Sequence, residues 1–207
     1  MLSKACARHV LEEIIKLYPN AKPALNYSNH FELLVSVMLS AQTTDEAVNK
    51  VTPDLFKKFP NPEAVVKSSP EEIEPYLKSI GLYRNKSKFL YQMSKQLVDQ
   101  FKGEVPHTRK ELESLSGVGR KTANVVLSIA FDTPAFAVDT HITRICKHHK
   151  IVPENATTLQ IEKRVTEVLP PKLWTQAHLS MLLFGRNICH PRNPECHNYP
   201  QLYDCTE

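Results

Sequence analysis

Two glycines one residue apart constrain this chain most, because they stand directly before a helix-forming run. Residues 115–123 read Leu-Ser-Gly-Val-Gly-Arg-Lys-Thr-Ala, and no helix breaker follows before Ala130. Glycine tolerates φ > 0, so this segment can form a tight hairpin. Backbone N–H groups then face outward at a helix start, where the helix dipole favours an anion. The segment therefore indicates a phosphate site, although a glycine-rich connection between two helices has the same pattern.

A second helix start follows eighteen residues after Lys121. Residues 137–141 read Ala-Val-Asp-Thr-His and open an apolar-periodic segment. The amine of Lys121 and the carboxylate of Asp139 can therefore face each other. An uncharged amine is a nucleophile, and an ionised carboxylate stabilises positive charge on a reacting sugar. The plainer alternatives are a phosphate-binding or solvated Lys121 and a helix N-cap at Asp139.

Four segments occur in an order that resembles the endonuclease III branch of the helix-hairpin-helix DNA glycosylases. They are Leu-Ser-Ala-Gln-Thr-Thr-Asp at 39–45, Ile-Gly-Leu-Tyr at 80–83, Gly-Val-Gly-Arg-Lys-Thr-Ala-Asn-Val-Val at 117–126 and Val-Asp-Thr-His at 138–141. The resemblance spans nearly the whole chain. Ser116 departs from it, because proline is common at this hairpin position, and we expect a slightly looser turn that keeps its amides.

The periodicity of the sequence predicts an all-α fold. Residues 31–41 form a nearly all-apolar segment, which indicates a central helix, and residues 83–101 form a long amphipathic one. No sustained alternation of apolar and polar residues argues for strands. The resemblance implies two helical domains that flank a DNA-binding cleft. These are a six-helix bundle domain over residues 23–133, with the helix-hairpin-helix at about 108–130, and a second domain over 1–22 plus 134–207.

The resemblance also implies a bifunctional DNA glycosylase and AP lyase that excises oxidised pyrimidines. Lys121 would form a Schiff base with the sugar, and β-elimination would then cut the strand 3′ to the abasic site. Asp139 would stay ionised beside it. A monofunctional glycosylase of the same fold, such as a mismatch-adenine enzyme, and a non-catalytic DNA-binding module are the alternatives. The joint presence of Lys121 and Asp139 favours the lyase.

Further residues are expected to contact DNA. A glycosylase must flip its target nucleotide out of the duplex and fill the gap. The resemblance assigns this role to Gln42 and Leu82, which taken singly are an ordinary loop glutamine and core leucine. Weaker candidates for lining the cleft are Asp45, His141 and Arg144. Phosphate contacts are expected from basic side chains and hairpin amides, namely Arg84, Lys86, Lys88, Gly117, Gly119, Arg120 and Lys121.

The cysteine-bearing tail departs from the family pattern. Endonuclease III-like proteins usually end in four cysteines, spaced C-x6-C-x2-C-x5-C, that hold a [4Fe–4S] cluster. Cys189, Cys196 and Cys205 fit this spacing, but Tyr199 occupies the third position. A phenol is a poor substitute for a thiolate at cluster iron, so we expect no cofactor. The alternatives are a cluster completed by histidine, or a zinc ion on these three cysteines with a non-cysteine fourth ligand.

Composition limits the setting and the partners. The net charge of +4 is compatible with a polyanion, and we expect a monomer that binds double-stranded DNA containing damaged bases or abasic sites. Five cysteines, three of them in the last 19 residues, do not resemble an extracellular disulfide framework. Cys6 and Cys146 are expected in the core. Without a signal-peptide core or a bilayer-spanning stretch, a cytoplasmic, nucleoid-associated protein with no membrane partner is expected.

Overall fold

The fold is all-α, as the sequence predicts. A computed structural model describes residues 1–205, and all regular structure within that range is helical. The chain divides into two compact units, one of residues 23–133 and the other of residues 1–22 with those from 134 onward. Within the described residues, no helix is both long and apolar enough to cross a membrane.

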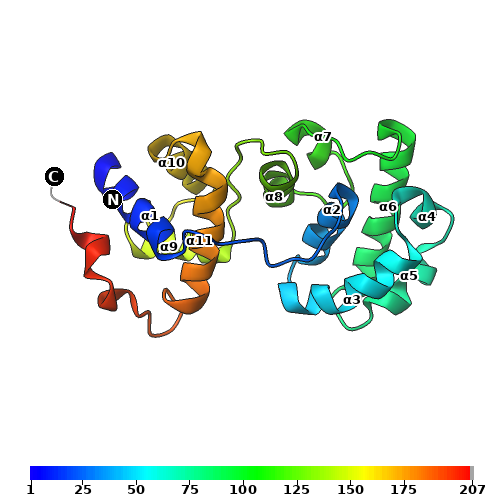
Figure 1. The fold of residues 1–207 in the computed structure, drawn as a ribbon, viewed down its shortest axis with the longest axis horizontal. Coiled ribbons are helices and arrows are strands. Elements are labelled where there is room, and N and C mark those ends of the chain that lie inside the picture. Colours follow the sequence, from blue (N-terminus) through cyan, green and yellow to red (C-terminus); the bar gives the residue numbers. More distant parts are fainter. Residues whose placement is uncertain (206–207) are drawn as a thin grey trace. The chain divides into compact units, whose positions relative to one another are not determined.

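Residues 23–133 contain seven α-helices, of which one, α2, is central and buried. The bounds are α2 His30–Leu39, α3 Asp45–Lys58, α4 Pro62–Val66, α5 Pro70–Leu77, α6 Tyr83–Phe101, α7 Arg109–Glu113 and α8 Arg120–Ala130 (Figure 1). Helix α2 begins where Asn29 accepts a hydrogen bond from the Glu32 amide at 2.9 Å. It packs against α3, α6 and α8, which confirms its predicted central position.

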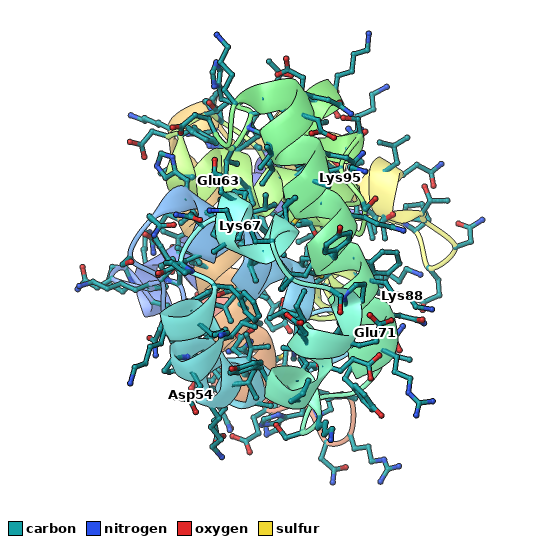
Figure 2. All side chains as sticks on the ribbon, turned by 90° about the vertical axis from the view of Figure 1, so that its right-hand side faces the viewer. Asp54, Glu63, Lys67, Glu71, Lys88 and Lys95 are labelled. Atoms are coloured by element: carbon teal, nitrogen blue, oxygen red, sulfur yellow. A yellow bond between two sulfur atoms is a disulfide. The ribbon has the colours of Figure 1, made fainter. Side chains whose placement is uncertain are left out.

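The outer side of this unit carries charged side chains. Helix α6 packs against α4 and α5, and Figure 2 shows Asp54, Glu63, Lys67 and Lys95 projecting from these elements and from α3. All four of these residues are exposed. The apolar faces of the same helices are buried, so the amphipathic pattern in the sequence places the core correctly.

As far as residue 205, the second unit contains four α-helices. The bounds are α1 Lys4–Leu17, α9 Thr140–His148, α10 Thr158–Val168 and α11 Trp174–Asn187, with 3₁₀ turns η1 Pro171–Leu173, η2 Cys196–Asn198 and η3 Pro200–Tyr203 (Figure 1). Helices α1 and α9 pack on α11, α10 packs on α1 and α9, and η3 returns to α1. The core of this unit includes Leu11, Ile14, Ile145 and Phe184, all fully buried.

A disulfide between Cys6 and Cys205 joins α1 to the tail. Cys6 is buried, as predicted, but the pairing of its sulfur with Cys205 was not predicted. The expectation of Cys205 as an alternative metal ligand is wrong here, because its sulfur is bonded to Cys6. The two residues are 199 positions apart, and η3 brings their Cα atoms to 5.4 Å. Sequence spacing carries no signal of that approach.

We expect the disulfide to stabilise the protein measurably. Cross-linking so distant a pair restricts the unfolded chain, so reduction should lower the free energy of unfolding by roughly 2–5 kcal/mol. Urea unfolding with and without reductant measures this difference. The double variant Cys6→Ser/Cys205→Ser should show no dependence on reductant. Titration of the unreduced, denatured protein should find three free thiols, those of Cys146, Cys189 and Cys196, and a count of five would contradict the pairing.

Candidate nucleic-acid interface and catalytic residues

The glycine hairpin ends in an open helix start. Gly117 has φ +78°, in the left-handed region that favours glycine, and Gly119 is the N-cap of α8. No side chain within the described residues caps this helix. Arg120 and Lys121 form its first turn, and both side chains are exposed. The predicted amides and the predicted nucleophile therefore stand at the same helix N-terminus, where the dipole attracts an anion.

Two side chains hold this hairpin in place. Gln96 of α6 donates from Nε2 to the Ser114 carbonyl at 3.0 Å and accepts from the Ser116 amide at 2.7 Å. Arg109 of α7 donates from Nε to Oδ1 of Asn124 in α8 at 2.9 Å. The sequence did not single out these residues, because a polar side chain on a helix gives no local sign of a distant backbone partner.

Gln42 and Leu82 lie at the exposed tips of two loops, one between α2 and α3 and one between α5 and α6, and both have strained backbone conformations. Their φ values are +54° and +60°, a region that costs a non-glycine side chain about 1–2 kcal/mol. Leu82 is 52% exposed, which excludes the alternative of a core leucine. A Cβ added to Gly81 would lie 4.0 Å from the Gln42 carbonyl oxygen, so the two tips are neighbours. Backbone strain of this kind clusters at functional sites.

Lys86 lies where phosphate cannot easily reach it. Its side chain is buried, only 3% exposed, and its Nζ donates to the Thr43 hydroxyl. Burial lowers the pKa of this amine. Instead of the expected surface contact, Lys86 braces the segment that carries Gln42. Asp45 follows as the first residue of α3, behind its N-cap Thr44.

The other basic side chains at the start of α6 are exposed. Arg84 places its guanidinium carbon 5.6 Å from the centre of the Tyr83 ring. Hydrogen bonding from its own backbone is the main cause that lowers the pKa of the Glu71 carboxyl, at the start of α5. The nearby charge of Lys88 lowers this pKa further (Figure 2). Arg84 is therefore the better placed of the two for a phosphate.

Asp139 is the N-cap of α9 and is half-buried. Its Oδ1 accepts a hydrogen bond from the Ile142 amide at 2.8 Å. The capping interpretation is thus correct, and the same bond fixes the carboxylate in position. Backbone N–H donors stabilise the charged form of a carboxylate, so capping and electrostatic roles are compatible in one residue.

His141 and Arg144 meet on the side of α9 that faces α11. Arg144 Nη2 lies 3.0 Å from His141 Nδ1 and donates to the Gly185 carbonyl at 2.7 Å. Burial is the main cause that lowers the pKa of His141, and Arg144 and Arg186 lower it further while Asp139 raises it. A Cβ on Gly185 would lie 2.9 Å from His141 Cβ. Gly185 was missed, although an isolated glycine in a helical pattern signals such packing.

The tail offers fewer cysteines for a metal than its spacing suggests. Cys189 and Cys196 are buried free thiols, whereas Cys205 is bonded to Cys6 and Tyr199 stands at the third position. A four-cysteine cluster therefore does not fit these residues. Burial raises the pKa of Cys196 to about 12, with Cys189 contributing. Cys196 still belongs to a group of side chains that could hold a metal ion.

An open helix start after a glycine hairpin is an arrangement through which proteins can bind the phosphate backbone of DNA. The sequence matches the HhH-GPD superfamily of base excision DNA repair proteins over residues 35–171. It is 44% identical to endonuclease III of Bacillus subtilis (strain 168) over 207 residues, which cover all of this chain and 94% of that one. The endonuclease III of Escherichia coli (strain K12) is 40% identical over 195 residues, 94% and 92% of the two chains.

A solved structure agrees with these sequences. The structure of a trapped endonuclease III–DNA covalent intermediate, an estranged-adenine complex, superposes with a TM-score of 0.95 and 44% identity. It covers all of this chain, and this chain covers 97% of it. The chain belongs to the endonuclease III family of the HhH-GPD superfamily.

The two hairpin glycines should respond differently to a side chain. A Cβ at Gly117 would lie 2.9 Å from Phe89 Cβ, in addition to its positive φ, whereas one at Gly119 would meet nothing within 4 Å. We expect Gly117→Ala to lower the free energy of unfolding by about 1–3 kcal/mol. Gly119→Ser, which supplies a good N-cap, should change it by less than about 0.5 kcal/mol. Urea titrations of both variants measure this, and equal losses would contradict the assignment.

Proposed function

We propose that this protein is a bifunctional DNA glycosylase and AP lyase of base excision repair that removes oxidised pyrimidines from double-stranded DNA. Lys121 is the nucleophile. The observation that carries the proposal is an exposed lysine in the first turn of α8, directly after the glycine hairpin. Support comes from the similarity over the whole chain to an endonuclease III that has been trapped in a covalent complex with DNA.

The reaction begins with attack by the uncharged amine of Lys121 on C1′ of the flipped nucleotide. The C1′–N bond to the base breaks, and the base leaves with its electron pair and takes up a proton. Opening of the sugar ring turns the new C1′–Nζ bond into a protonated Schiff base. Loss of a proton from C2′ then expels the 3′ phosphate, which cuts the strand. Water finally releases the lysine.

Asp139 stabilises the positive charge that develops on the sugar and the amine. Its hydrogen bond to the Ile142 amide holds the carboxylate in one orientation. A side chain fixed before the reaction needs no reorganisation as charge appears. We therefore assign Asp139 an electrostatic role in preference to that of a mobile base.

DNA binding rests on the helix start and the two strained tips. The α8 amides at Gly117 and Gly119, with the side chains of Arg84 and Arg120, bind phosphates. Gln42 and Leu82 enter the duplex where the target nucleotide has left. Asp45, His141 and Arg144 line the site less directly.

The remaining expectations form part of the same proposal. The unit of residues 23–133, with seven α-helices of which α4 and α7 have five residues each, supports the expected helical-bundle domain, and the other unit supports the second helical domain. The protein carries no [4Fe–4S] cluster, because Tyr199 replaces one ligand and Cys205 is bonded to Cys6. It acts as a monomer in the cytoplasm, associated with the nucleoid.

Borohydride trapping on a duplex with an abasic site tests the nucleophile. The wild-type protein should form a covalent adduct, and Lys121→Gln should form none while it still binds the duplex. Lys110→Gln, which changes a lysine in the preceding helix α7, is the matched control and should trap normally. Base release without any trapped adduct would indicate a monofunctional glycosylase. Binding alone would indicate a non-catalytic module.

Asp139→Asn separates the charge from the cap. Asparagine caps a helix as well as aspartate, so the free energy of unfolding should change by less than about 1 kcal/mol. The turnover rate should fall on the order of 10²-fold or more, because the charge that stabilises the transition state is lost. Single-turnover kinetics and urea unfolding on the same preparation measure both effects. Unchanged turnover would exclude the proposed role.

Leu82→Asn should lower activity on duplex DNA without lowering the stability of the fold. Asparagine tolerates the left-handed region, so the variant should be as stable as the wild type or up to about 1 kcal/mol more stable. Activity on a damaged duplex should fall roughly 10-fold, whereas cleavage of a single-stranded abasic substrate should not, because no gap needs filling. Lys102→Asn, at φ +57° at the other end of α6, is the control. It should keep full activity on both substrates.

A further inference from the structure

The end of α9 and the tail bring together groups that the proposed repair reaction does not use. His148 is the last residue of α9, His149 is its C-cap, and Cys196 begins η2. One ring nitrogen of each histidine and the Sγ of Cys196 all lie within 4.8 Å of one another. His149 and Cys196 are buried, at 4% and 2% exposure.

We propose that His148, His149 and Cys196, with Cys189 as the fourth ligand, form a mononuclear site for a divalent metal ion of the zinc type. Two thiolates and two imidazoles are the ligand set of closed, tetrahedral structural zinc sites. In such a site the ligand atoms lie roughly 3.3–3.8 Å apart. The ligand atoms of His148, His149 and Cys196 lie within 4.8 Å of one another, so these three residues require only small side-chain adjustments on binding.

The buried ring of His149 is an independent observation in favour of a metal site. Its Nε2 is buried and has no hydrogen-bond partner among residues 1–205, while its Nδ1 lies 3.3 Å from the Tyr203 hydroxyl. Buried polar atoms in folded proteins are almost always satisfied. An imidazole that is held through one nitrogen and binds a metal through the other is the usual arrangement at metal sites. Tyr203 thus orients the ring of His149.

Cys189 lies beside this group of three. Its thiol is close enough to that of Cys196 to help raise the pKa of the Cys196 thiol. The loop between the two cysteines is closed where the Glu195 amide donates to the Ile188 carbonyl at 2.9 Å. Arg144 donates from Nε to the Cys189 carbonyl at 2.9 Å and so brings a positive charge towards the two sulfurs. That charge offsets part of the cost of ionising two buried thiols.

An ion can reach this cluster from solvent. His148 is exposed, and a cavity of about 280 Å³ is lined by His148, His149, Tyr203 and the Cys6–Cys205 disulfide. The disulfide closes the tail over this cavity and keeps Cys205 out of the ligand set. The site thus differs from the four-cysteine pattern of the family in using two histidines at the C-terminal end of α9.

Metal titration tests the site without reference to activity. Chelator-treated, full-length protein is titrated with Co²⁺, whose spectrum reports thiolate bonding and tetrahedral geometry, and then with Zn²⁺ in competition. We expect one ion per chain and a thiolate-to-metal band that Zn²⁺ abolishes. His148→Gln changes an exposed residue and should fold, yet it should weaken binding at least 10-fold. Tyr203→Phe should weaken it about 10-fold.

Two control variants distinguish this ligand set from metal binding at the remaining cysteines. Cys6→Ser/Cys205→Ser should bind Co²⁺ normally, because Cys205 is no ligand, and Cys146→Ala should do so as well. Cys196→Ser should lose the thiolate band. The proposal is overturned if the wild type binds no metal at equimolar Co²⁺, if His148→Gln binds as tightly as the wild type, or if binding requires Cys205. Purified protein that contains iron with inorganic sulfide would also overturn it.

Discussion

The left-handed turn at Gly117 is the constraint on which the proposed chemistry depends. Its φ of +78° and the close approach of Phe89 and Met38 leave no room for a side chain. This turn allows α8 to begin at Gly119 with its first-turn amides uncapped by any side chain of the described residues. Lys121 follows two residues later, so one backbone conformation sets both the amides that we propose to bind phosphate and the amine that we propose to react.

The same unit concentrates backbone strain at the two exposed turns that we propose to enter the DNA duplex. Gln42 and Leu82 both have positive φ values. The buried Lys86 donates a hydrogen bond to the Thr43 hydroxyl and so supports the segment that carries Gln42. A buried amine that donates to a loop hydroxyl contributes rigidity more than affinity. In this protein of base excision repair, the exposed tips are thus held in shape before DNA arrives, which reduces the ordering cost of binding.

Local sequence patterns were sufficient for the helices and for the helix starts. The apolar run of 31–41 predicted the central α2, and the glycine pair predicted an open start at α8, because periodicity and φ preferences are properties of short segments. Contacts between segments that are distant in the chain have no such local sequence pattern and could not be predicted. The Cys6–Cys205 bond, the burial of Lys86 and the meeting of His149 with Cys196 each depend on tertiary packing.

The central claim is that Nζ of residue 121 forms the bond to deoxyribose. Peptide mapping by mass spectrometry of the adduct that borohydride reduces on abasic DNA tests it most directly. The account predicts that the sugar-derived mass lies on Lys121 and that trypsin no longer cleaves after that residue. An adduct on any other lysine or on the N-terminal amine, with residue 121 unmodified, would contradict it.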